Sequence, residues 1–168
     1  MTSFRHLLAE QLSDIHSAET QISEALPKLI ESASDDELKD ALSMHLDETR
    51  DQIMRLERVF EELGESPSGK VCVGMKGLLE EGEEATHKRV TGTLRDALII
   101  AGAQRVEHYE ISAYGTAIAW AKQLDLDDVV DLLDESLDEE AAADEKLTSI
   151  AEGGLLATGV NEEAAGNR

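Results

Sequence analysis

The stretch EHYEISAYG (Glu107–Gly115) places two glutamates, Glu107 and Glu110, on the side of a predicted helix that should be buried. It follows the apolar segment ALIIAGA (Ala97–Ala103), whose residues define that side. Burying an unpaired carboxylate costs several kcal/mol, so such acids either take up protons or face a cation. These two glutamates therefore need compensation from their surroundings, so we look for matching polar residues on the other helices of the chain.

Apolar residues recur at alternating intervals of three and four along four segments, which is typical of helices with one buried face. These segments span residues 8–29, 38–59, 96–124 and 130–150. Ser34, which is followed by acidic residues, predicts the N-cap of the second helix. The composition, with few aromatic residues and prolines and much Ala, Leu and Glu, agrees with an all-α fold.

A long segment, residues 64–93, separates the second and third predicted helices. It begins with the loop-like GESPSG, continues with a short helix interrupted by glycines, and ends with the break VTGT. A connection of this length is needed when the chain must travel from one end of a bundle to the other. The sequence therefore predicts a four-helix bundle over residues 1–152, with a long crossover that contains a short helix. Residues 153–168, which begin with two glycines, are predicted to form a loosely ordered C-terminal tail.

Each of the four predicted helices is interrupted near its middle by acidic residues or histidine on its buried side. The same exception at similar depth in every helix indicates one shared site. Carboxylates and imidazole suit iron and manganese, and ligands from four helices can hold two such ions. The candidate metal ligands are Glu19, His45, Glu48, Glu107, Glu110, Glu140 and Asp144. Tyr114, one turn after Glu110, either packs in the core or donates a hydrogen bond to a ligand carboxylate.

The charge is strongly unbalanced, with 37 Asp and Glu against 15 Lys and Arg and a formal net charge of −22. Nucleic acid is excluded as a partner, because binding it requires cationic side chains that neutralise phosphates. The sequence predicts no membrane span and no signal peptide, so we expect a cytoplasmic protein. Because so many acids repel one another unless salt screens them, we also expect a halophilic protein from a cytoplasm of high salt concentration.

Five stretches resemble the YciE/YciF-like family of ferritin-like stress proteins, and together they reach over most of residues 4–152. They are LSDIHSAETQISEALPKL (12–29), HLDETRDQIMRLERVFEELG (45–64), KVCVGMKGLLEEG (70–82), VEHYEISAYG (106–115) and LDEEAAADEKLTSIA (137–151). The resemblance implies a ferritin-like bundle of the rubrerythrin type, a candidate dinuclear site at mid-bundle, and a homodimer. It also implies a role in stress responses rather than one defined reaction.

The main hypothesis is therefore a ferritin-like stress-response protein whose iron or manganese ions handle metal or an oxidant such as O2 or peroxide. Better-known ferritin-like enzymes carry Glu-x-x-His on two helices. Here the second helix has the reverse order, His45-x-x-Glu48, and the fourth has Glu140 and Asp144 without a histidine, which makes the site more anionic. The alternative hypothesis is a non-enzymatic, stress-induced structural or interaction protein with a vestigial or purely structural acidic site.

Overall fold

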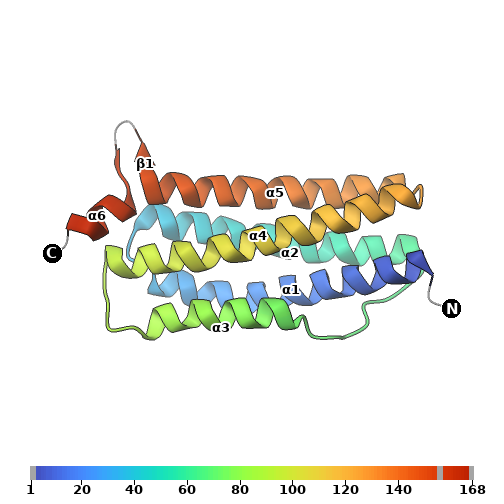
Figure 1. Cartoon of the computed structure of the whole chain (residues 1–168), viewed down its shortest axis with the longest axis horizontal. Coiled ribbons are helices and arrows are strands. Elements are labelled where there is room, and N and C mark those ends of the chain that lie inside the picture. Colours follow the sequence, from blue (N-terminus) through green and yellow to red (C-terminus); the bar gives the residue numbers. More distant parts are fainter. Residues whose placement is uncertain (1–2, 155–156, 167–168) are drawn as a thin grey trace.

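Four long helices pack side by side in the computed structural model, which describes residues 3–154 and 157–166 (Figure 1). Their bounds are α1 Phe4–Ser32, α2 Asp36–Leu63, α4 Thr93–Gln123 and α5 Asp127–Glu152. α1 packs on α2 and α4, and α5 packs on α4 and α2. The predicted all-α four-helix bundle is confirmed.

The crossover between α2 and α4 contains the short helix α3, Val73–His87. α3 lies along the outside of the bundle and packs on α1 and α4. Because this segment carries the chain back along the bundle, α2 and α4 run in the same direction (Figure 1). The predicted long crossover with a short helix is therefore confirmed.

The junction between α1 and α2 is tied to the start of α4 by Asp96, a fully buried carboxylate. Its two oxygens accept hydrogen bonds from the backbone amides of Ser34 (2.7 Å) and Asp35 (3.1 Å). The N-cap of α2 is Asp35, whose side chain accepts from the amide of Leu38, so the prediction of Ser34 was wrong by one residue. The contact with Asp96, far along the chain, orients the junction in a way that local sequence does not reveal.

The buried core consists of two hydrophobic clusters that meet at mid-bundle. On α1 one cluster ends at Ile15 and the other begins at Ala18, and on α4 they are separated between Val106 and Tyr114. Buried polar residues from all four long helices lie in between, and we call them the polar layer. It consists of Glu19, His45, Thr49, Gln52, Arg55, Glu107, Glu110, Ser136 and Glu140.

The described part of the C-terminal segment packs back on the bundle. β1 (Gly153–Gly154) pairs antiparallel with β2 (Ala157–Thr158), and α6 (Val160–Gly166) lies against α4 and α5. Val160 is buried in a hydrophobic cluster, which gives this segment, expected from sequence to be loosely ordered, an anchor. The division of the chain into a bundle and a separate tail at residue 152 stays a prediction.

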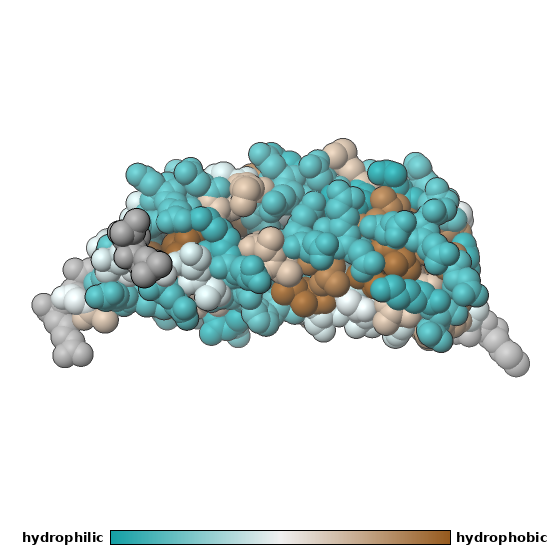
Figure 2. Space-filling model, turned by 90° about the horizontal axis from the view of Figure 1, so that it is seen from above, coloured by the Kyte–Doolittle hydropathy of each residue, from teal (hydrophilic) through white to brown (hydrophobic). Residues whose placement is uncertain are grey.

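Hydrophilic residues cover most of the face shown in Figure 2, with smaller hydrophobic patches between them. None of the helices in the described part of the chain has the length and apolar character that crossing a bilayer requires. The hydrophilic surface is consistent with a chain whose net charge is −22, in which acidic side chains outnumber basic ones on the outside of the bundle.

We expect the melting temperature to rise with KCl concentration, because added ions shorten the range of repulsion between surface carboxylates from about 10 Å at 0.1 M to about 3 Å at 1 M. Differential scanning calorimetry over this interval measures the effect. Sucrose at matched osmolality is the control, since it acts by exclusion from the protein surface rather than by screening. A melting temperature that stays constant in KCl would contradict the expectation of a halophilic protein.

Candidate metal centre

Four side chains from three helices meet inside the polar layer. His45 of α2, Glu107 and Glu110 of α4, and Glu140 of α5 each offer one ligand atom, and these atoms all lie within 4.8 Å of one another. All four side chains are buried. Oxygen and nitrogen atoms at such separations can surround a single cation, so we call these residues the four-residue group.

Glu19 brings α1 to the same layer. Its side chain is fully buried, and its Oε1 accepts a hydrogen bond of 2.5 Å from the hydroxyl of Tyr114. Repulsion from Glu140 acts on the Glu19 carboxyl, and repulsion from Glu19 acts on the Glu110 carboxyl, which places Glu19 beside the four-residue group. Of the two roles predicted for Tyr114, the structure shows both: the ring is buried in a hydrophobic cluster and the hydroxyl binds a candidate ligand.

Glu48 and Asp144 lie at the edge of the site, outside the four-residue group. The Glu48 side chain is 29% exposed, and its Oε2 is 3.9 Å from Nδ1 of His45. Asp144 is 22% exposed, accepts a hydrogen bond from Gln104 (3.2 Å), and lies 3.4 Å from Nδ1 of His108. The structure therefore brings five of the seven candidate ligands into the buried layer and leaves these two near solvent. The ligand roles of all seven stay predictions.

A second set of polar residues supports the acids, and the sequence reasoning did not assign it a role. The Gln52 amide donates to Glu140 Oε1 (2.5 Å) and to Glu139 Oε2 (2.9 Å). The Arg55 guanidinium holds both oxygens of Glu139 at 3.0 Å and also donates to Ser136 at 2.7 Å. The sequence feature that could have revealed this set is Gln52, a polar residue on the buried side of the second predicted helix.

Burial dominates the electrostatics of the layer. It raises the pKa of Glu19, Glu107 and Glu110 well above the usual value for glutamate, and repulsion among these carboxyls and from Glu140 raises the pKa further. The hydrogen bond from Tyr114 acts in the opposite direction and lowers the pKa of Glu19. Burial lowers the pKa of His45, which favours the neutral imidazole that a metal ion requires.

The residues present fit a metal ion, because buried ligand atoms lack hydrogen-bond partners within the protein. These atoms are Oε2 of Glu19, Glu107 and Glu140, both carboxylate oxygens of Glu110, and both ring nitrogens of His45. Buried polar groups in folded proteins are rarely left unsatisfied in such numbers. Several carboxylates with one imidazole form a hard, anionic donor set of the kind that suits iron or manganese.

Comparison with known proteins places the chain in one family. The model of the family described as a domain of unknown function, DUF892, matches residues 3–165. Protein YciF of Escherichia coli (strain K12) is 41% identical over 152 residues, which cover 90% of this chain and 92% of YciF.

Solved structures agree with this relationship. The E. coli stress protein YciF has a TM-score of 0.86 at 42% identity, covering 89% of this chain and 94% of YciF. YcfI from Rhodopseudomonas palustris has a TM-score of 0.85 at 48% identity, covering 89% of this chain and 95% of YcfI. A Xanthomonas campestris protein, at 18% identity and a TM-score of 0.71 over 88% of this chain and 89% of its own, shares the fold alone. The resemblance to YciF-like proteins is confirmed, and the chain belongs to the DUF892 family.

Proposed function

We propose that this chain is a ferritin-like stress-response protein that binds iron or manganese at mid-bundle and uses the site to handle metal or an oxidant. One observation carries the proposal: buried ligand atoms from three helices lie within 4.8 Å of one another and lack protein partners at several of their oxygens and nitrogens. Repulsion among several buried carboxylates needs a compensating positive charge, and a divalent ion supplies it.

The four-residue group would hold one ion. A second ion, as in a dinuclear site, would lie toward α1, where Glu19 faces Glu110 and Glu140. Both oxygens of Glu110 lack protein partners, so this glutamate is suited to serve both ions. When bound, iron or manganese supplies electron transfer to O2 or peroxide.

The surrounding residues give the site its geometry and exclude water. Tyr114 directs one oxygen of Glu19 by its hydrogen bond, and Gln52 does the same for Glu140. Such outer hydrogen bonds orient ligands and typically change metal affinity by about 10- to 100-fold when removed. The two hydrophobic clusters, one on each side of the layer, keep the ligands away from bulk water.

The biological setting is taken from the relatives and from composition. YciF of E. coli is called a stress protein, and we extend that role to this chain at 42% identity. A cytoplasmic location, a homodimer and a small oxidant as reaction partner belong to the same proposal. Size-exclusion chromatography with light scattering decides whether the chain is a dimer.

The alternative is a non-enzymatic structural or interaction protein in which the acids only stabilise the bundle. The hydrogen bonds from Tyr114 to Glu19 and from Gln52 to Glu140 favour this view, because they partly satisfy the carboxyls without any ion. Protons retained by the carboxyls with raised pKa values would satisfy the rest.

Metal titration of the stripped protein separates the two functions. Isothermal titration with Mn(II), and with Fe(II) under anaerobic conditions, is expected to give close to two ions per chain for a dinuclear site. A stoichiometry of one ion would leave the four-residue group as the whole site and contradict the dinuclear proposal. Absence of tight binding of either metal would contradict the proposed function and favour the structural alternative.

A further inference from the structure

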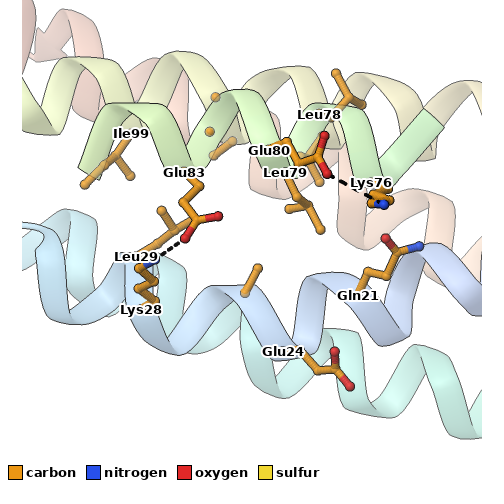
Figure 3. Close-up of a pocket in the computed structure, with 15 residues that line it drawn as sticks. Gln21, Glu24, Lys28, Leu29, Lys76, Leu78, Leu79, Glu80, Glu83 and Ile99 are labelled. Atoms are coloured by element: carbon orange, nitrogen blue, oxygen red, sulfur yellow. Dashed lines mark hydrogen bonds and ion pairs between the residues drawn. The ribbon is translucent and has the colours of Figure 1, made fainter. Parts of the chain in front are cut away.

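A cavity of about 410 Å³ lies between α1, α3 and α4 (Figure 3), and we call it the crossover cavity. Pockets of roughly 300–1,000 Å³ are typical of small-molecule sites. Its walls are mostly apolar, and they include Ala25, Leu29, Leu79, Ile99, Ala103 and Val106. Figure 3 shows Leu79 of α3 pointing into the space between α3 and α1.

The inner end of the crossover cavity approaches the metal centre. A second, small cavity of about 20 Å³ is lined by His45 and Glu107. It shares wall residues with the crossover cavity, namely Ala25, Leu29, Leu79, Ala103 and Val106. A molecule in the crossover cavity would therefore lie one layer of side chains away from two candidate ligands.

Both lysines that line the cavity are already paired with acids, and Glu24 adds a further carboxylate to the lining. Lys28 of α1 forms an ion pair with Glu83 of α3, and Lys76 of α3 lies 3.8 Å from Glu80 (Figure 3). An anion would have to break one of these pairs and would also enter a chain with a net charge of −22. A cation would have to leave water for apolar walls. Both considerations favour an uncharged ligand.

The cavity is preformed because α3 is held on the bundle at both ends. At its start, the Cys72 amide donates to Ser17 Oγ at 2.9 Å, and Cys72 Sγ lies 3.0 Å from the Tyr109 hydroxyl and 3.1 Å from Asp14 Oδ2. Near its end, the ion pair of Glu83 with Lys28 links α3 to α1. A ligand would thus meet a formed site and would not have to order the crossover.

We propose that the crossover cavity is a binding site for an uncharged small organic molecule with an apolar body, placed beside the metal centre. This goes beyond the proposed function, because binding in the cavity requires no metal. The position of its inner end means that such a molecule would lie one layer of side chains from His45 and Glu107, on the α3 side of the bundle.

A matched pair of fluorescent probes tests the proposal on metal-free protein. N-phenyl-1-naphthylamine is uncharged, and 1-anilinonaphthalene-8-sulfonate has the same ring system with an added sulfonate. We expect the uncharged probe to bind with increased fluorescence, and to bind about tenfold or more tightly than the sulfonate, a difference of one decade in Kd. Comparable binding of both probes, or no binding of the uncharged one, would overturn the proposal.

Two filling variants from different helices locate the site. Ala25→Leu on α1 and Ala103→Leu on α4 add side-chain volume to the cavity and should each weaken binding of the uncharged probe by about tenfold or more. Ala142→Leu adds the same side chain at an exposed position of α5, and should leave binding unchanged. Circular dichroism identifies any variant that fails to fold, and the other then carries the test.

Retained affinity in a folded filling variant would place the probe elsewhere and overturn the proposal. Because all measurements use metal-free protein, their outcome is independent of metal titration. Probe binding without metal binding would support the cavity as a binding site and contradict the proposed function. Metal binding without probe binding would contradict only the proposal that the cavity binds a ligand.

Discussion

Replacing Glu107 and Glu140 together by glutamine is expected to abolish metal binding and, in metal-free protein, to stabilise the fold. Both carboxylates belong to the four-residue group and come from different helices, α4 and α5. Their removal takes two anionic ligands from any ion, so affinity should fall by at least about 100-fold, the upper range for lesser changes around a metal. Mn(II) titration by calorimetry measures this loss.

The gain in stability follows from the burial of the same groups. Burial and the neighbouring acids oppose ionisation of Glu107, so neutral amides of similar shape relieve repulsion in the metal-free protein. We expect the free energy of unfolding in urea with EDTA to rise by about 1–3 kcal/mol at neutral pH. The control is Glu57→Gln with Glu145→Gln, which removes two exposed carboxylates from α2 and α5. Metal binding that survives the double replacement would exclude the four-residue group as the site.

Between about pH 5 and 8, the stability of metal-free protein should fall as pH rises, whereas the stability of metal-loaded protein should not. The folded pKa values of Glu19, Glu107 and Glu110 are raised, so in this range the native chain holds more protons than the unfolded chain. Stability is therefore greatest near the unfolded value of about 4.3 and is lost as pH rises through the folded values, by up to about 1.4 kcal/mol per carboxyl and pH unit.

His45 acts in the opposite sense, because burial lowers its pKa and protonation below about pH 6.5 favours the unfolded chain. Three carboxyls outweigh this single imidazole. With Mn(II) bound, the carboxyls must be ionised, so the stabilisation by metal increases with pH and binding releases protons.

Urea unfolding at several pH values, in 1 M KCl to screen the surface, compares protein in EDTA with protein in Mn(II). In EDTA the variant with glutamine at positions 107 and 140 should show a smaller decrease with pH than the unmodified chain. Identical slopes with and without Mn(II) would mean that no ion binds to the ionised carboxyls of the polar layer.

The architecture was predictable because periodicity and length determine it. Apolar residues at helical spacing revealed the four long helices, and the 64–93 segment was long enough to show that the chain crosses the bundle. The N-cap of α2 was missed by one residue since Asp96, a distant contact, binds the amides of Ser34 and Asp35. The packing of α6 depends on the burial of Val160, and this burial cannot be predicted from a single apolar residue in a short polar segment.

The candidate site was predictable only as far as the spacing along a helix shows which side of the helix each residue faces. Glu48 follows His45 by three residues, which turns it about 60° around a helix of 3.6 residues per turn, and it lies at the rim. Asp144 follows Glu140 by four residues and lies about 6 Å further along the axis, outside the layer. Gln52 was on the stripe, but its contact with Glu140 depends on how α2 faces α5, which periodicity does not determine.

The polar layer also fixes how far each helix can slide along the bundle axis. A shift of α4 by one turn, about 5.4 Å, would carry Glu107 and Glu110 toward the hydrocarbon of a neighbouring cluster. It would also bring apolar side chains opposite Glu19 and Glu140. Because each misplaced acid costs several kcal/mol, shifted arrangements of the same four helices are strongly disfavoured. A bundle held by aliphatic side chains alone would tolerate such slippage more easily, so these acids define a single alignment of the helices even when no ion is bound.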